Sequence, residues 1–139
     1  MFRIRQIDHL VLRVVDIETM LAFYTGALGC TLEKTQAKIG LYQLRAGESL
    51  IDLVTVDGSI GRMGGAAPGR QARNLDHFCL RVEPFDADAI RAHLLVHGAE
   101  AGPVESRYGA GGDGPSIYLH DPEGNQVELK GPPWEGGVA

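Results

Sequence analysis

Apolar and polar residues alternate in two similar octets of this chain, and such alternation is typical of β-strands. Residues 7–14 have the sequence Ile-Asp-His-Leu-Val-Leu-Arg-Val, and residues 75–82 have Leu-Asp-His-Phe-Cys-Leu-Arg-Val. Five of the eight positions are identical, and the other three exchange one apolar residue for another. The octets therefore indicate an internal repeat, which predicts one structural unit present twice.

Each octet leads into a segment whose apolar residues recur at near-helical spacing. Asp16 and Asp86 precede these segments and are good N-caps. Gly29 and Gly98 follow them and can end a helix in a left-handed conformation. The apolar residues of the first predicted helix are Ile17, Leu21, Tyr24 and Leu28. Those of the second are Ala87, Ile90 and Leu94.

Short strand-like runs follow each predicted helix. They are Ile39–Leu44 and Ser49–Val56 in the first half, and Ser116–His120 and Gln126–Lys130 in the second. Residues 121–125 predict a tight turn between the last two, because Pro presets φ and Gly tolerates positive φ. This order of elements predicts an α+β fold made of two tandem βαβββ modules.

The modules are expected to span residues 1–57 and 75–131 of a single domain, residues 1–139, with residues 58–74 as a linker rich in Gly, Ala and Arg. The second module is longer than the first, and the glycine-rich segment Ser106–Pro115 is predicted to be a loop that holds the insertion. The tail, Trp134–Ala139, is expected to be mobile.

Each half also carries an acidic residue between branched apolar residues: Asp52 in the first and Glu128 in the second. Strand side chains alternate between faces, so His9 shares the face of Asp52, and His77 that of Glu128, away from the helix. Because an unpaired buried carboxylate is costly, the repeated pair predicts a metal site. Two imidazoles and two carboxylates suit Zn, Ni, Co, Mn or Fe(II), with positions left for water or substrate.

Alternatives stay open for several residues. A lone strand histidine is commonly a packed residue. Asp52 is shorter than Glu128, which leaves three alternatives: it binds a metal directly, through water or not at all. Arg13 and Arg81 lie on the histidine face, where they bind an anionic ligand or form a salt bridge. Less specific candidates are His93 and His97, expected at the surface; His120 near the turn; and Tyr42, Tyr108 and Tyr118, as substrate contacts.

Composition excludes some classes of function. The net charge of −5 does not suggest the clustered basic face that a nucleic-acid partner requires. No apolar stretch reaches the roughly 20 residues of a membrane helix, and the N-terminus does not resemble a signal peptide. Cys30 and Cys79 form no disulfide framework and are expected to be buried free thiols. A cytoplasmic location is therefore expected.

Residues 9–14 with Asp16, Phe23-Tyr24 and Leu28-Gly29 resemble the first module of the vicinal oxygen chelate superfamily. Asp76-His77 and residues 121–129 resemble its second module. The resemblance implies paired βαβββ modules forming a cupped, partly open barrel that is usually completed in a homodimer. It places metal ligands at His9, Asp52, His77 and Glu128, although the second ligand of glyoxalase I is normally Glu rather than Asp.

The resemblance implies a small enzyme that binds its substrate through adjacent oxygens on a divalent metal and transfers a proton as a lyase or isomerase, with Glu128 as the catalytic residue. Fosfomycin-type thiol transferases, which use only the equivalents of His9, His77 and Glu128, and dioxygenases are alternatives. A drug- or metabolite-binding protein of the bleomycin-resistance type is an alternative of another class. In every case the expected partner is a small molecule, without nucleic acid or membrane.

Overall fold

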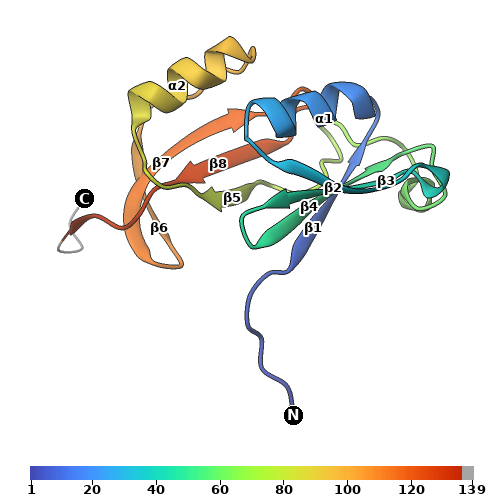
Figure 1. Cartoon of the computed structure of the whole chain (residues 1–139), viewed down its shortest axis with the longest axis horizontal. Coiled ribbons are helices and arrows are strands. Elements are labelled where there is room, and N and C mark those ends of the chain that lie inside the picture. Colours follow the sequence, from blue (N-terminus) through green and yellow to red (C-terminus); the bar gives the residue numbers. More distant parts are fainter. Residues whose placement is uncertain (136–139) are drawn as a thin grey trace. The chain divides into compact units, whose positions relative to one another are not determined.

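The structure is a computed structural model that describes residues 1–135, and it divides after Asn74 into two compact units. The N-terminal unit begins with an exposed extended segment and then forms one four-stranded sheet in the order β1-β4-β3-β2 (Figure 1). Strand β1 is parallel to β4, and the other pairs are antiparallel. Its elements are β1 (His9–Val14), α1 (Ile17–Gly26), β2 (Thr31–Gln36), the short 3-10 helix η1 (Ala37–Ile39), β3 (Leu41–Ala46), β4 (Ser49–Thr55) and η2 (Gly61–Gly64).

The second unit repeats this topology. Its sheet has the order β5-β8-β7-β6, with β5 parallel to β8 and the other pairs antiparallel. Its elements are β5 (Phe78–Arg81), α2 (Ala87–Val96), β6 (Glu105–Gly109), β7 (Gly112–His120) and β8 (Gln126–Lys130). The predicted α+β fold of two βαβββ modules is thereby confirmed.

Each sheet buries one apolar face beneath the helix of its own unit (Figure 1). In β1 the buried residues are Leu12 and Val14, both 0% exposed, whereas Val11, directly before Leu12, is 46% exposed. This is the alternation that the first octet predicts. Other apolar side chains with less than 2% exposure are Met20, Tyr24, Leu44, Ile51 and Leu53 in the first unit, and Leu94, Ile117, Leu119 and Val127 in the second.

The predicted caps are confirmed at the start of both helices. Asp16 accepts from the backbone N–H of Thr19, and Asp86 accepts from that of Ala89, each at 3.1 Å. The first helix ends at Gly26, earlier than the apolar spacing up to Leu28 predicts. The N–H of Cys30 bonds back to the Tyr24 carbonyl at 2.9 Å, so the last turn closes around positive-φ Gly29.

The prediction of a loop at Ser106–Pro115 is wrong, because β6 and β7 form a β-hairpin over this segment. The sequence pattern also does not predict strand β2. Both β2 and β6 are edge strands with no fully buried residue, so neither has the apolar alternation from which a strand is recognised.

The C-terminal end of the described chain is held in place at Trp134. Its backbone N–H donates to the Asp113 carbonyl and its Nε1 donates to Ser106 Oγ, both at 2.8 Å. The expectation that the tail is mobile is therefore wrong for Trp134. Residues 136–139, to which the same expectation applies, lie outside the described residues.

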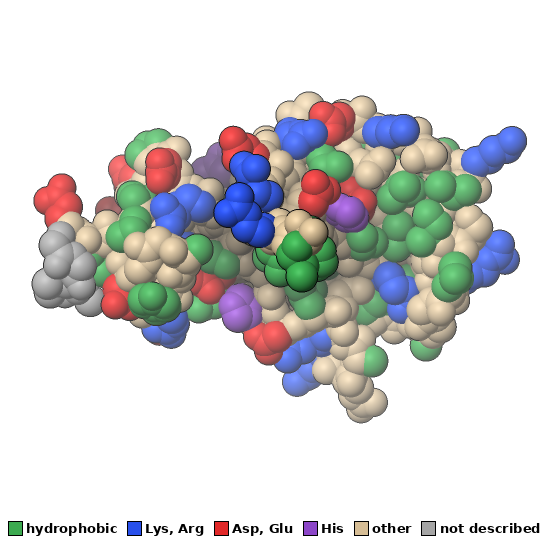
Figure 2. Space-filling view, turned by 90° about the horizontal axis from the view of Figure 1, so that it is seen from below, with side chains coloured by type: hydrophobic (Ala, Val, Ile, Leu, Met, Phe, Trp, Pro, Cys, Tyr) green, Lys and Arg blue, Asp and Glu red, His purple; other side chains and the backbone are tan. Residues whose placement is uncertain are grey.

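Acidic and basic side chains are interspersed on the face shown in Figure 2, with apolar side chains among them. No extended basic region is seen on this face, in keeping with the net charge of −5. Neither described helix, at ten residues each, has the length and hydrophobicity needed for a membrane crossing.

Candidate functional site

The two parallel strand pairs place the predicted histidines and acids at equivalent positions. In the first unit Val11 pairs with Asp52, and in the second Cys79 pairs with Glu128. Each histidine stands two residues before the partner of the acid, on the same face of the sheet. The strand register therefore repeats the histidine–acid pair in each unit.

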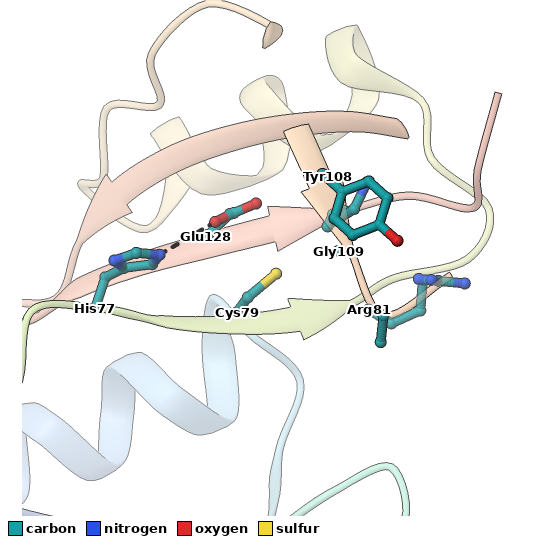
Figure 3. Close-up of a pocket in the computed structure, with 8 residues that line it drawn as sticks. His77, Cys79, Arg81, Tyr108, Gly109 and Glu128 are labelled. Atoms are coloured by element: carbon teal, nitrogen blue, oxygen red, sulfur yellow. Dashed lines mark ion pairs between the residues drawn. The ribbon is translucent and has the colours of Figure 1, made fainter. Parts of the chain in front are cut away.

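Glu128 is a buried carboxylate whose two oxygens have different partners. It lies in the middle of β8 and is only 5% exposed. Its Oε2 accepts a hydrogen bond of 2.6 Å from Ser116 Oγ, and its Oε1 lies 3.3 Å from His77 Nε2 (Figure 3). Of the predicted ligands, the structure thus brings His77 and Glu128 within contact distance.

Hydrogen bonds keep the Glu128 carboxylate ionised despite its burial. Burial by itself would raise the pKa of Glu128, because it disfavours the charged form. Hydrogen bonds from Ser116, Tyr118 and Cys79, together with the charge of His77, outweigh burial and lower this pKa below its usual value. The carboxylate is therefore in the form that a metal ligand requires.

Both histidines are oriented by the aspartate that precedes them. His9 Nδ1 lies 2.8 Å from Asp8 Oδ1, and His77 Nδ1 lies 2.6 Å from Asp76 Oδ2. In a neutral ring this contact places the proton on Nδ1 and leaves the Nε2 lone pair for another partner. Metal-binding histidines commonly have such a carboxylate behind them.

The first unit offers a less elaborate site. Asp52 is 4% exposed, and Gln43 Nε2 lies 3.3 and 3.4 Å from its two carboxylate oxygens. The hydrogen bond to Asp8 is the main cause of a raised pKa at His9, and the charge of Asp52 adds to it. The negative charge of Asp52 therefore contributes to the raised pKa of His9.

The expectation that both cysteines are buried is wrong for Cys79, while Cys30 is buried as expected. Cys79 belongs to the histidine face of β5, which carries the pocket, and not to the face that forms the core. Desolvation by surrounding atoms, with the neighbouring Glu128 charge, raises the pKa of Cys79 to about 11. At neutral pH the group is a protonated thiol that donates to Glu128.

A pocket of about 330 Å³ lies on this face of the second sheet. Its lining includes His77 and Glu128 at one end and Arg81 and Tyr108 at the other (Figure 3). Lys130 at the end of β8 lines it as well. Tyr118, predicted as a substrate contact, has its ring centre 5.9 Å from that of His77. The pocket is therefore continuous with the candidate ligands of the second unit.

The two arginines of the repeat have different environments. Arg13 donates to the Gly61, Gly65 and Ala66 carbonyls at 2.8, 2.6 and 3.0 Å, so its guanidinium is held by the segment predicted to be a linker. Arg81 instead lines the pocket and is 40% exposed, although Nη1 lies 3.6 Å from Glu83 Oε1. Arg13 is thus structural, while Arg81 can reach a ligand.

The remaining candidates are peripheral to this pocket. His93 and His97 contact each other at the end of α2, with ring centres 4.8 Å apart, and both are exposed as expected. His120 is exposed at the end of β7.

Asp8, Asp76 and Ser116 are not among the site residues that the sequence predicts. For the aspartates a signal was present, because both octets have Asp directly before His. Ser116 carries no such signal, since a buried serine is recognised as a donor to Glu128 only when the register of β7 and β8 is known.

The residues of the second unit fit a divalent metal in their chemistry. A buried carboxylate and the imidazole Nε2 that faces it at 3.3 Å form an oxygen–nitrogen donor pair that borderline ions accept. Among residues 1–135, no group of three or more His, Cys, Asp or Glu side chains is assembled by itself.

Proteins of known sequence resemble this chain over most of its length. It is 34% identical over 128 residues to the glyoxalase domain-containing protein RDO1 of Mycosarcoma maydis, which covers 91% of this chain and 68% of that protein. It is 33% identical over 138 residues to the virulence protein STM3117 of Salmonella typhimurium, with 91% of this chain and 83% of that protein covered.

Solved structures show the same fold. The crystal structure of STM3117 aligns with a TM-score of 0.76 and 27% identity, covering 94% of this chain and 99% of that chain. The fosfomycin resistance protein FosX of Listeria monocytogenes, crystallised with Mn(II) and 1S,2S-dihydroxypropylphosphonic acid, aligns with a TM-score of 0.69 and 19% identity, covering 96% and 94%. A family model matches residues 6–129. The resemblance found in the sequence is thereby confirmed, and the chain belongs to the Glyoxalase/Bleomycin resistance protein/Dioxygenase superfamily, the vicinal oxygen chelate superfamily.

Proposed function

We propose that this protein is a metal-dependent enzyme of the glyoxalase type, in which His9, Asp52, His77 and Glu128 hold one divalent ion. Its substrate is a small molecule that binds the ion through adjacent oxygens. The reaction is a proton transfer of the lyase or isomerase type, with Glu128 as the catalytic residue.

The observation that carries this proposal is the arrangement around Glu128. A buried carboxylate ordinarily pairs with a cation or takes up a proton. Here a hydrogen bond of 2.6 Å from Ser116 favours the ionised form, and His77 Nε2 faces it at 3.3 Å. Asp76 fixes the His77 ring from behind at 2.6 Å. A carboxylate and an imidazole prepared in this way are suited to binding a cation together.

FosX of Listeria monocytogenes, which shares the fold, is described with Mn(II) bound. Manganese accepts carboxylate and imidazole ligands, which makes it the first ion to test among Zn, Ni, Co, Mn and Fe. The Cys79 thiol, with its pKa raised to about 11, does not compete as a thiolate ligand at neutral pH.

When bound, the metal supplies a Lewis acid that stabilises negative charge on a substrate oxygen. Glu128 would accept the proton from the adjacent carbon of the substrate and return it to another atom of the same substrate, so that the carboxylate is regenerated. Hydrogen bonds lower the pKa of Glu128, so at neutral pH it is ionised, the form that can accept a proton. Ser116 and Tyr118 hold the carboxylate in one orientation during this transfer.

The experiment is metal analysis combined with three matched substitutions. Glu128→Gln keeps the shape but removes the charge and the base, so metal content and activity should both be lost. Asp52→Asn should be milder if Asp52 binds through water. Glu48→Gln, at an exposed turn, serves as the control.

Activity is assayed with the native metal against methylglyoxal–thiol adducts, fosfomycin and catechols, which separates the glyoxalase-like reaction from thiol transfer and oxygenation. Metal retained by Glu128→Gln at the wild-type level would refute the site. A protein that binds metal and one of these compounds without converting it would be a binding protein instead.

A homodimer is also part of the proposal, with each site formed either within one chain or between two. Mixing His9→Ala with His77→Ala chains distinguishes the two arrangements. Sites between chains regain one intact set of ligands per mixed dimer, so metal binding returns on mixing. Sites within a chain gain nothing on mixing, and light scattering shows whether the dimer exists.

A further inference from the structure

Lys130, the last residue of β8, is buried although its ammonium group is strongly hydrated in water. The residue is 3% exposed. Within residues 1–135 its Nζ is the only buried side-chain nitrogen or oxygen atom that lacks a hydrogen-bond partner. Such a group destabilises the fold unless another molecule satisfies it. Lys130 also lines the pocket that contains His77 and Glu128.

The β6–β7 hairpin is shaped around the Lys130 side chain by its glycines. A Cβ on Gly109 would lie 2.6 Å from Cε of Lys130, and one on Gly114 would lie 2.8 Å from Nζ. Any larger residue at these positions would displace the lysine. The hairpin thus leaves the room that the lysine needs in order to extend along the pocket.

Arg81 lies beside Lys130 and adds a second cation. The two residues are partners in the parallel ladder of β5 and β8. A Cβ on Gly111 would lie 2.8 Å from the Arg81 guanidinium, so a third glycine of the hairpin lies against this group. The pair with Glu83, at 3.6 Å between exposed groups, is weak and leaves Arg81 able to turn to a ligand.

The internal repeat shows that the fold does not require a lysine here. Arg13 pairs with Val54 in the first unit as Arg81 pairs with Lys130 in the second. Val54 is 2% exposed, so an apolar residue fills the equivalent position. Its guanidinium partner, Arg13, is held by backbone carbonyls. The second unit therefore has a buried lysine, Lys130, where the first unit has an apolar residue, and its partner Arg81 is not held by backbone carbonyls as Arg13 is.

We propose that Lys130 and Arg81 form a subsite for the oxyanion group of the substrate, a carboxylate or a phosphonate. An ammonium and a guanidinium are suited to binding such a group through charge-assisted hydrogen bonds. This inference rests on the proposed function in one respect: that proposal places the rest of the substrate near Glu128 and His77. It defines the substrate class as a small organic acid.

The spacing along β8 limits the size of that acid. Glu128 and Lys130 are two residues apart on one face, a separation of roughly 6–7 Å along the strand. A short acid can thus bind Lys130 with its oxyanion while its adjacent oxygens lie near Glu128 and His77. The pocket volume of about 330 Å³ agrees with a small ligand.

The test measures binding of malonate and phosphonoacetate to protein freed of metal by chelation and then of chelator by gel filtration. Calorimetry and thermal unfolding are measured for wild type, Lys130→Met and Arg81→Gln. The exposed Lys34→Met is the control. Dimethyl malonate, which is neutral, and inorganic phosphate show whether an organic oxyanion is required.

We expect malonate or phosphonoacetate to bind wild type and Lys34→Met, and to bind Lys130→Met at least about tenfold more weakly, because a charged hydrogen bond is lost. Arg81→Gln should weaken binding in the same direction. Lys130→Met itself should keep or raise the unfolding temperature, since it removes an unpaired buried cation.

Equal binding by Lys130→Met and wild type would overturn the subsite, as would binding of dimethyl malonate as tight as that of malonate. Because metal is absent, failure here leaves the metal proposal untouched. Conversely, oxyanion binding through Lys130 in a protein that never binds metal would support the subsite and refute the proposed function alone.

Discussion

Replacing Ser116 by Ala tests whether the hydrogen bond to Glu128 holds the site together. Ser116 is 0% exposed and its Oγ donates to Glu128 Oε2 at 2.6 Å. A hydrogen bond to a charged group contributes about 1.5–3 kcal/mol. Tyr118 and Cys79 still donate to Glu128 in the variant, so we expect a loss of free energy of unfolding at pH 7 near the lower end of that range.

The loss should depend on pH in a defined direction. The pKa of Glu128 is lower in the folded chain than in the unfolded chain, so its stabilisation is present above the unfolded value and is lost as pH falls through the folded value. Ser116→Ala raises the folded pKa towards the unfolded one. The difference between wild type and variant is therefore largest near neutral pH and shrinks in acid.

Urea unfolding of the metal-free protein between pH 7 and 4 measures the difference, and an NMR titration of the Glu128 carboxyl measures its pKa directly. Ser49→Ala is a matched control, because its hydroxyl donates to the neutral Ile7 carbonyl at 3.1 Å. The control should cost less, about 0.5–1.5 kcal/mol, without dependence on pH. A Ser116→Ala loss that is equally independent of pH, or an unchanged Glu128 pKa, would refute the reasoning.

Two further predictions concern the carboxylate of Asp76 behind His77 and the turn at residues 121–125. Asp76→Asn removes the carboxylate behind His77 Nδ1 and should weaken metal affinity by about 10- to 100-fold, measured by competition with a chelator, while Asp88→Asn at the start of α2 should not. Gly124 has φ +86°, so Gly124→Ala should cost about 1–2 kcal/mol in urea unfolding. Gly102→Ala, where a Cβ meets its first neighbour at 3.7 Å, should cost under about 0.5 kcal/mol.

The sequence was most informative where one face of an element is buried. The octet at residues 7–14 predicts both the strand and its register, because a shift by one residue would expose Leu12 and Val14. The turn at residues 121–125 was likewise predictable. Asp121 accepts from the Glu123 and Asn125 backbone N–H groups at 2.9 and 3.0 Å, and such local bonds depend on few residues.

Polar edges and distances within the site could not be predicted. The edge strands β2 and β6 bury no residue completely, so their pairing depends on neighbours distant in the sequence. Alternation places Lys130 on the face of Glu128, but it does not show that Nζ lacks a partner. That fact depends on the glycines of a hairpin which the sequence suggested to be a loop.

The repeat also shows why Glu128, rather than Asp52, is the better candidate for chemistry. Both acids are buried and occupy equivalent register positions, so burial and position in the sheet do not distinguish them. Their neighbours differ, because Asp52 contacts the Gln43 amide at 3.3–3.4 Å, whereas Glu128 receives the Ser116 hydroxyl at 2.6 Å. Shorter bonds to a charged oxygen are stronger and fix its orientation more closely. With Lys130 two residues further along β8, the second unit carries the hydrogen-bond donor, the buried carboxylate and a buried lysine on a single sheet.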